Sequence, residues 1–233
     1  MIDTKVLGII PARGGSKGIP RKNLVSVAGR PLIAHTVEHA RASTRLSRAV
    51  VSSDDPEICA VARQWGADVP FVRPAELATA TATAVDVACH ALMAVEAEEQ
   101  IRYQVVCLLE PTSPLRKPED IDRAIELIEE TGADAVIGVY RIESPHPAKT
   151  LRIEEGRILP YFDGTSPSRL RQALPPAYAV NGAVYCVRRA VLMEQRSFWG
   201  SSTVPYIMPA ERSVNIDRPL DLHFAAFLLS GGR

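Results

Sequence analysis

Residues 11–23, with the sequence PARGGSKGIPRKN, form the part of the chain best suited to bind an anion. Their three glycines let backbone N–H groups approach a ligand closely, and turns of this kind form concavities that bind anions. A plain surface turn needs fewer glycines and no such density of charge directly after an apolar run. Four cations can add charge-assisted hydrogen bonds to phosphate oxygens: Arg13, Lys17, Arg21 and Lys22. The pattern therefore predicts a phosphate site.

Other familiar catalytic patterns are absent. The glycine spacing is neither that of a Walker loop nor the Gly-x-Gly-x-x-Gly of dinucleotide oxidoreductases. His35 and His39 stand four apart, but no third metal ligand accompanies them, so they are interpreted as ordinary helix-face residues. Ser52 and Ser53 lack a Gly-x-Ser-x-Gly elbow, which favours a strand end before a helix cap over a nucleophile.

Alternating strands and helices must position this loop. Apolar runs predict strands at 5–12, 49–53, 69–72, 103–109, 135–140 and 183–187. Helical spacing, acidic caps and first-turn prolines predict helices at 31–43, 54–66, 83–98, 118–130 and 219–229. The alternation indicates βαβ units in an α/β fold with a mostly parallel sheet. Ligands of such sheets bind beyond the carboxyl ends of the strands, where residues 11–23 would lie.

The rhythm changes after about residue 140. Residues 144–174 hold four prolines and a possible hairpin at 151–159 around Glu154-Glu155-Gly156. We expect a single domain over residues 1–233 with an inserted lobe at about 141–175.

The composition is that of an ordinary globular protein. Hydrophobic residues make up 46%, and 27 Lys and Arg balance 27 Asp and Glu, so no nucleic-acid partner is expected. No apolar run is long enough to span a membrane, and no signal peptide is visible, so a cytoplasmic location is expected. No Cys-x-x-Cys pair occurs, which favours buried reduced thiols over a disulfide framework or a zinc site for the four cysteines: Cys59, Cys89, Cys107 and Cys186.

Six segments spread over nearly the whole chain resemble the acylneuraminate cytidylyltransferases, or CMP-sialic acid synthetases. They are IIPARGGSKGIPRKN at 9–23, VSSDD at 51–55, RPAELATATAT at 73–83, LLEPTSPLR at 108–116, NGAVY at 181–185 and SVNIDRPLDL at 213–222. The resemblance implies a three-layer α/β/α sandwich with a Rossmann-like sheet, as in nucleotide-diphospho-sugar transferases. It implies that a sialic-type sugar acid attacks the α-phosphate of CTP, releasing pyrophosphate. It also implies a homodimer in which the lobe swaps into the partner.

The resemblance assigns the nucleotide side of the site. Arg13 and Lys22 match the two phosphate-binding cations, which would stabilise charge on the α-phosphate and the leaving pyrophosphate. Ala12 would lie near cytosine and Thr83 near the nucleotide sugar, although Thr83 could equally be a helix cap. The remaining expected nucleotide-binding residues are Gly14, Ser16, Lys17 and Asn23.

A triphosphate needs a hard cation, so Mg²⁺ is the expected cofactor. The family pattern has two aspartates flanking an isoleucine, whereas this chain has Asn215-Ile216-Asp217. Asp217 is the expected metal ligand, and Asn215 keeps a carbonyl oxygen but lacks the charge.

On the acid side, Lys149 and Arg171 match cations that face the sugar acid, although both could be plain loop cations. Asn181 and Tyr185 belong to the matching NGAVY segment and are expected to bind this substrate. The resemblance also places aromatic residues, here Tyr185, Phe198 and Trp199, around the sugar, though they could simply belong to the core.

Glu110 departs from the glutamine that is usual in the sialic acid enzymes. An ionised glutamate only accepts hydrogen bonds, so it could favour a different nonulosonic acid. Alternatively it could pair with Arg116 or Lys149 and never touch the substrate.

Three alternative functions remain open at this point. A Kdo cytidylyltransferase would share the fold and the reaction, but its motif differs from LLEPTSPLR. A sugar-1-phosphate nucleotidyltransferase would show a loop resembling Gly-x-Gly-Thr-Arg-Leu, which is absent. A catalytically impaired nucleotide-binding homologue is consistent with the amide at Asn215.

Overall fold

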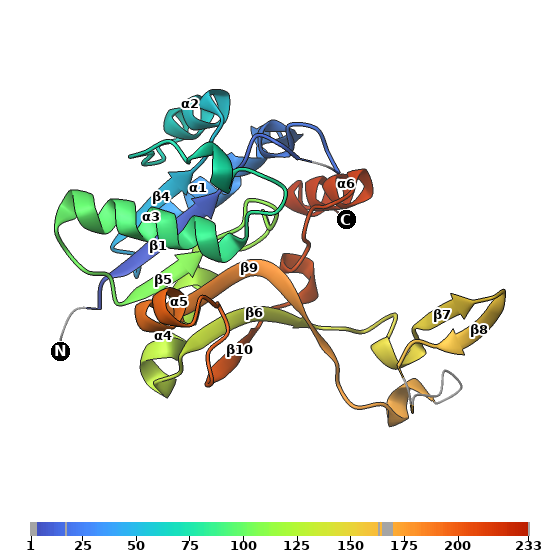
Figure 1. The fold of residues 1–233 in the computed structure, drawn as a ribbon. Coiled ribbons are helices and arrows are strands. Elements are labelled where there is room, and N and C mark those ends of the chain that lie inside the picture. The colour runs from blue at the N-terminus through green and yellow to red at the C-terminus, as the bar shows by residue number, and fades with distance from the viewer. Residues whose placement is uncertain (1–3, 17, 163, 165–169, 233) are drawn as a thin grey trace.

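The computed structural model describes residues 4–16, 18–162, 164 and 170–232 (Figure 1). Its main sheet contains β1 (Val6–Pro11), β4 (Arg48–Ser52), β5 (Val105–Leu108), β6 (Ala135–Arg141), β9 (Tyr178–Arg188) and β10 (Thr203–Ile207). Two short hairpins are β2 (Ser26–Val27) with β3 (Arg30–Pro31), and β7 (Leu151–Glu154) with β8 (Arg157–Pro160). The helices are α1 (Leu32–Ala42), α2 (Pro56–Gln64), α3 (Ala84–Glu99), α4 (Pro118–Thr131), α5 (Arg189–Glu194) and α6 (Pro219–Leu229).

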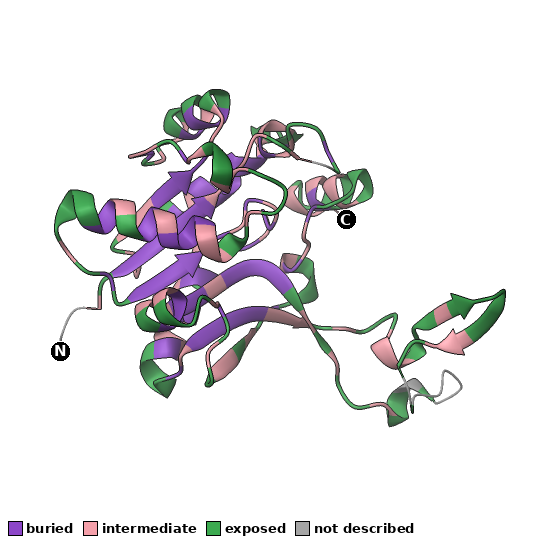
Figure 2. Cartoon of the chain, in the orientation of Figure 1, coloured by how far each residue is buried: buried purple, intermediate pink, exposed green. Residues whose placement is uncertain are grey.

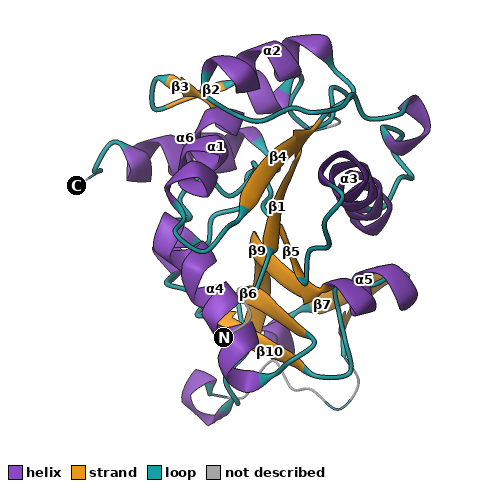
Figure 3. Cartoon of the chain, turned by 90° about the vertical axis from the view of Figure 1, so that its left-hand side faces the viewer, coloured by secondary structure: helices purple, strands orange, loops and turns teal. Residues whose placement is uncertain are grey.

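The sheet has six strands in the order β10-β6-β9-β5-β1-β4. All neighbours pair in parallel except at β9, which runs antiparallel to both β5 and β6. Helices α3 and α5 cover one face, and α1 and α4 cover the other (Figure 3). The expected α/β/α sandwich with a mostly parallel sheet is therefore confirmed.

The central strands β1 and β5 are buried on both faces (Figure 2), because each face carries its own apolar set. In β1, Val6 and Ile10 pack toward α1, α2 and α4, whereas Leu7 and Ile9 pack toward α3 and α5. This alternation follows the two-residue period of a strand and holds β1 in the centre of the core. The loop that begins at the end of β1 is thus attached to a strand that is buried in the core.

Residues 142–177 leave the sheet after β6 and return to it at β9. They contain the predicted hairpin, β7–β8, which projects away from the sheet (Figure 1). Its turn has Glu155 and Gly156 in the left-handed region, with φ of 50° and 76°. The hairpin carries exposed apolar side chains, with Ile153 75% and Ile158 68% exposed. We call residues 142–177 the lobe.

Two expectations from the sequence were wrong. Residues 69–72 form no strand, because only Asp68 bridges to β4, through Val50. Cys107 and Cys186 are joined in a disulfide, since β5 and β9 place them opposite each other with Cα atoms 4.3 Å apart. Pairing across 79 residues cannot be read from spacing alone. Cys59 and Cys89 are free and buried, as expected.

The sequence patterns also did not predict α5, β10 or the short β2–β3 hairpin. Among the described helices, none combines the length and hydropathy that a membrane crossing requires.

Candidate active site

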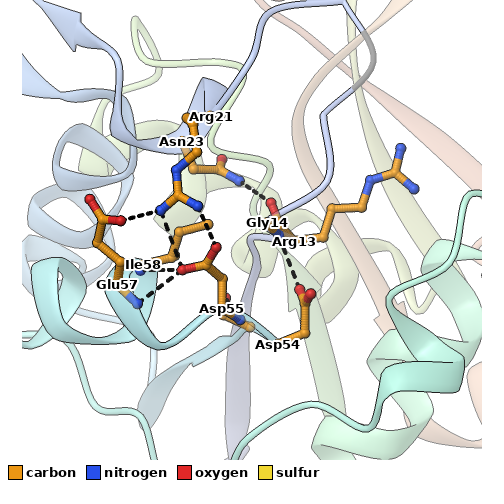
Figure 4. Close-up of polar contacts among 9 residues, drawn as sticks. Arg13, Gly14, Arg21, Asn23, Asp54, Asp55, Glu57 and Ile58 are labelled. Atoms are coloured by element: carbon orange, nitrogen blue, oxygen red, sulfur yellow. Dashed lines mark hydrogen bonds and ion pairs between the residues drawn. The ribbon is translucent and has the colours of Figure 1, made fainter.

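A clamp of acidic residues holds the loop at residues 12–23 near both of its ends (Figure 4). The Gly14 N–H donates to Asp54 Oδ1 at 3.1 Å. Arg21 forms ion pairs with Asp55 at 2.8 Å and with Glu57 at 2.5 Å. These acids lie between β4 and the first turn of α2, where Asp55 also caps the helix by accepting from the Glu57 and Ile58 N–H groups. We call Asp54, Asp55 and Glu57 the acidic clamp.

The clamp explains two sequence features of the loop. Gly14 must lack a side chain, because a Cβ there would lie 2.6 Å from Asp55 Oδ2. Arg21 was grouped with the phosphate cations, but its guanidinium is occupied by the clamp. The Arg21 pairs also contribute to the lowered pKa of Asp55, together with the backbone N–H of Ile58 and against the opposing effect of burial.

Arg13 and Lys22 line a cavity of about 610 Å³ at the carboxyl end of β1. The Arg13 guanidinium makes no ion pair with the clamp and points away from Asp54 and Asp55 (Figure 4); it donates to the Thr79 carbonyl at 3.0 Å. Asn23 donates its amide to the Arg13 carbonyl at 3.0 Å, which fixes the backbone of the loop. Ser16 also lines the cavity, and Lys17 lies outside the described residues.

Lys22 joins the loop after β1 to residues 216–217, which precede α6. Its ammonium group donates to the Ile216 carbonyl at 2.8 Å and to Asp217 Oδ1 at 3.0 Å. Gly18 passes so close to this stretch that a Cβ would lie 2.5 Å from the Asp217 carbonyl oxygen. A predicted phosphate cation and a predicted metal ligand are therefore neighbours in space, although 195 residues separate them.

Glu110 also lines the cavity, together with Pro111, Thr112 and Asn215. Burial raises the pKa of the Glu110 carboxyl, and the nearby Asp217 carboxylate raises it further. No ion pair to Glu110 occurs within the described part of the chain, so the expected pairing with Arg116 or Lys149 is not seen. Arg116 instead donates to the backbone carbonyls of Glu110 and Ala183 and to Thr36 Oγ1.

The donors present fit a divalent cation that shares its shell with a triphosphate. Asn215 Oδ1 is buried and has no hydrogen-bond partner, and Asp217 offers an exposed carboxylate beside it in the chain. Among the described residues, no three His, Cys, Asp or Glu side chains group to hold a metal by themselves. Mg²⁺ commonly takes one or two carboxylates together with phosphate oxygens and water, which suits this set.

Several predicted residues lie outside the cavity lining. Thr83 is the N-cap of α3, where it accepts from the Asp86 N–H at 3.1 Å, so the alternative of a helix cap is confirmed. Ala12 is completely buried. Lys149 lies at the base of the projecting hairpin, and the Arg171 side chain is outside what the structure describes.

Asn181 and Tyr185 lie on β9. The Asn181 amide is buried and bonds within the fold, donating to Ser213 Oγ at 3.0 Å and accepting from the Ala183 N–H at 3.0 Å. Tyr185 is partly buried; burial raises the pKa of its phenol, and Glu110 raises it further. Its ring lies 5.8 Å from that of Phe198, which is in the core, whereas Trp199 is 55% exposed.

Sequence reasoning missed Arg73, which is 4% exposed. Its guanidinium donates to Ser52 Oγ at 3.0 Å and to the Ser52 carbonyl. Burial lowers the pKa of Arg73 to about 10, against the opposing effect of Asp54, and Arg13 lowers it further. The only feature of the sequence that could have pointed to Arg73 is its place before a proline at the start of RPAELATATAT.

Comparisons with known proteins identify the family of this chain. A family model described as cytidylyltransferase matches residues 7–207. The chain is 34% identical to a CMP-N,N'-diacetyllegionaminic acid synthase of Legionella pneumophila, covering 93% of each protein. It is 33% identical to a pseudaminic acid cytidylyltransferase of Campylobacter jejuni, covering 96% of each.

A third relative is longer than this chain. The N-acylneuraminate cytidylyltransferase of Escherichia coli is 33% identical over 95% of this chain, but this chain spans only 51% of that protein.

Solved structures support the fold. A CMP-2-keto-3-deoxy-manno-octonic acid synthetase complexed with CTP superimposes with a TM-score of 0.69 at 18% identity, covering 98% of this chain and 99% of that one. A 4-diphosphocytidyl-2C-methyl-D-erythritol synthase from Anaerococcus prevotii superimposes with a TM-score of 0.68 at 14% identity, with the same coverage. The matched family model and the relatives that are 33% and 34% identical over most of the chain establish that the chain is a nucleotidyltransferase belonging to the cytidylyltransferase family.

Proposed function

We propose that this enzyme transfers CMP from CTP to a nonulosonic acid and releases pyrophosphate. The observation that carries the proposal is the cavity at the end of β1, which brings the cations Arg13 and Lys22 together with Glu110, Asn215 and Asp217. The three named relatives are a synthase of CMP-N,N'-diacetyllegionaminic acid and cytidylyltransferases of N-acylneuraminate and pseudaminic acid, which supports a nonulosonic acid as the acceptor.

On the nucleotide side, the protein mainly supplies position and charge. Phosphoryl-type transfer requires little covalent work from the protein, so stabilising charge on the phosphates is the main task. We assign this to Arg13 and Lys22, with Ser16 and Lys17 toward the β- and γ-phosphates. Asn23 holds the Arg13 backbone in place through its amide, which favours a loop arranged before CTP arrives.

Magnesium is the proposed cofactor. It would be held by Asp217 and by the carbonyl oxygen of Asn215, in the company of triphosphate oxygens. When bound, it would neutralise charge on the phosphates. Lys22, which donates to Asp217 at 3.0 Å, would then balance the charge of that carboxylate and keep it directed at the phosphates.

The acid side of the site would be completed by a second copy of the chain. Lys149 lies just before β7 in the lobe and is not among the residues that line this chain's own cavity. The exposed Ile153 and Ile158 give the hairpin an apolar surface that an isolated chain would leave in water. A homodimer in which each lobe reaches the partner's cavity would bury this surface and bring cations to the carboxylate of the sugar acid.

Pyrophosphate release tests the proposed function. The purified protein is incubated with Mg²⁺, one nucleoside triphosphate and one acid, using CTP, UTP and GTP against sialic, legionaminic, pseudaminic and Kdo-type acids. We expect release only with CTP and one of the first three acids, with Arg13→Ala as the inactive control. Release that is fastest with the Kdo-type acid would establish the Kdo alternative, and no release with any pair would indicate an impaired homologue.

A further inference from the structure

Strand β9 is distorted where it passes the carboxyl end of β5. The pairing of β6 with β9 shifts register between Ile137 and Val139, which leaves β9 with extra residues at a bulge. Gly182 lies in this bulge with a φ of 71°, in the left-handed region that favours glycine. A Cβ on Gly182 would lie 2.6 Å from Glu110 Oε2 and 3.2 Å from Ser113 Oγ. The bulge therefore brings the backbone of β9 against the residues that follow β5.

Asn181, in the same bulge, uses both ends of its amide inside the fold. Its side chain is buried, and Nδ2 donates to Ser213 Oγ at 3.0 Å and to Met208 Sδ at 3.0 Å. Its Oδ1 accepts from the Ala183 N–H at 3.0 Å. The backbone carbonyl of Asn181 accepts from Ser113 Oγ at 3.0 Å. Asn181 is thus bonded both to the segment after β5 and to the segment before α6.

Both of these segments line the cavity. Residues 110–112 line it from the segment after β5, and Asn215 and Asp217 line it from the segment before α6. Asn181 is not among the lining residues. It therefore lies behind the cavity wall and joins two parts of that wall that are far apart in the sequence.

Residues 213–217, which we call the aspartate segment, are held near both ends. Asn181 fixes the first residue through the Ser213 hydroxyl, and the Ile216 N–H donates to the Thr112 carbonyl at 2.8 Å. The bond from Asn181 is buried, so water cannot easily replace it when one partner is removed. Loss of this bond should therefore loosen the start of the aspartate segment.

We propose that Asn181 is a positioning residue, which fixes the aspartate segment against the end of β5 and so sets where Asp217 faces the cavity. This inference rests on the proposed function, because it concerns the placement of Asp217 beside the triphosphate. Asn181 acts through Ser213 and touches neither substrate, in contrast to the contact with the sugar acid that the resemblance implies. A buried amide suits this task, because one neutral side chain supplies both a donor and an acceptor.

Hydrogen exchange followed by mass spectrometry tests the role of this bond without any substrate. Asn181→Ala and Ser213→Ala each remove one partner, and we expect the amides of the aspartate segment to exchange roughly fivefold faster in both. Exchange in residues 12–23 should stay as in the wild type, because the acidic clamp still holds that loop. The double variant should exchange no faster than Asn181→Ala, since both substitutions remove the same bond.

Steady-state pyrophosphate release separates positioning from substrate contact. For Ser213→Ala we expect kcat to fall roughly tenfold, because a displaced Asp217 is no longer aligned with the triphosphate. The KM for the sugar acid should stay unchanged. Ser213→Thr keeps the hydroxyl and should recover most of the rate.

Ser47→Ala is the matched control. Ser47 Oγ also accepts from an N–H group, that of Val6, at 3.0 Å, and Ser47 is not among the residues that line the cavity. We expect this variant to show the kinetics of the wild type and the same exchange in the aspartate segment. Melting curves check that every variant is folded.

Unchanged exchange in the aspartate segment of both variants would overturn the proposal, whether or not the wild type turns over CTP. A lower melting temperature with an unchanged kcat would overturn it too, because Asn181 would then serve stability alone. A change confined to the KM for the sugar acid would instead assign Asn181 to that substrate. The exchange measurement needs no turnover, so its result stands apart from the pyrophosphate assay of the proposed function.

Discussion

The loop at residues 12–23 and the lobe differ in how contacts within the chain hold them. The loop at residues 12–23 starts from a strand buried in the centre of the core, and the acidic clamp fixes it at Gly14 and Arg21. The lobe is a long excursion whose hairpin packs little of its apolar surface within its own chain. The first region is held in place by contacts within its own chain, whereas the second leaves its apolar side chains exposed, which is why we propose that it acts against a second copy of the chain. Substitutions in the two regions should therefore impair the protein in different ways, and measurements on variants can distinguish these effects.

The largest effect is expected for Arg13→Ala. The loop keeps its clamp, so the melting temperature should not move, but one preorganised charge contact is lost. Such a loss typically lowers kcat by about 10²–10³-fold. Steady-state pyrophosphate release measures it, and Arg123→Ala on the exposed face of α4 serves as a control of equal chemistry. A variant with near-normal kcat/KM would remove Arg13 from the active site.

The lobe should give the next largest effect. Replacing Ile153 and Ile158 together by Asp puts charge on the exposed apolar face of the hairpin. Sedimentation should then show the mass of one chain, 25.4 kDa, where the wild type shows twice that mass. We expect kcat/KM to fall by roughly tenfold as the partner's cations are lost. A wild type that sediments as a monomer would contradict the proposed role of the lobe.

A smaller effect is expected from the clamp. Arg21→Ala removes two ion pairs of a side chain that is 46% exposed, and such pairs contribute about 0–1 kcal/mol each. The melting temperature should therefore barely change. The KM for CTP should rise up to about fivefold, because a looser loop pays more to become ordered on binding. Arg21→Lys should recover part of this, and an unchanged KM would show that Gly14 and Asn23 suffice to hold the loop.

Thr83→Ala should change stability alone. Loss of the cap on α3 costs about 1 kcal/mol, which a denaturant titration can detect. Thr83→Ser keeps the hydroxyl and should behave like the wild type. The expected KM for CTP is unchanged, and a clear rise in the alanine variant would support the contact with the nucleotide sugar that the resemblance implies.

The contrast between the two regions also shows what the sequence could predict. Apolar runs such as 5–12 and 103–109 predict the central strands, because a strand buried on both faces requires unbroken hydrophobic residues. The hairpin at 151–159 was found from a local turn signal. By contrast, β10 was missed because Thr203, Pro205 and Tyr206 break the apolar pattern on a strand at the edge of the sheet.

For the site, glycines and cations that cluster in one short segment allowed the sequence to predict part of the cavity lining. Arg13, Ser16, Lys22 and Asn23 line the cavity, whereas the lining does not include Ala12, Gly14 or Thr83. The sequence could not predict which cation serves which partner. Arg21 pairs with the acidic clamp, and Arg116 donates to backbone carbonyls. Both sets of contacts join residues that are dozens of positions apart in the sequence. The partners of Arg116 are equally invisible in a sequence, because Thr36 lies on α1 and Ala183 on β9.

The way the lobe joins the sheet has a consequence for how this protein could change. Arg141, the last residue of β6, pairs with Tyr178, the first residue of β9. The two ends of the lobe therefore lie side by side at the sheet. The closure of this long segment is already provided by the pairing of β6 with β9, the most extensive strand pairing in the described sheet. Because the entropy of loop closure grows only slowly with length, the lobe can gain or lose residues at little cost to the sheet. In the proposed function, recognition of the acceptor acid could thus diverge in the lobe while the loop at residues 12–23 stays unchanged.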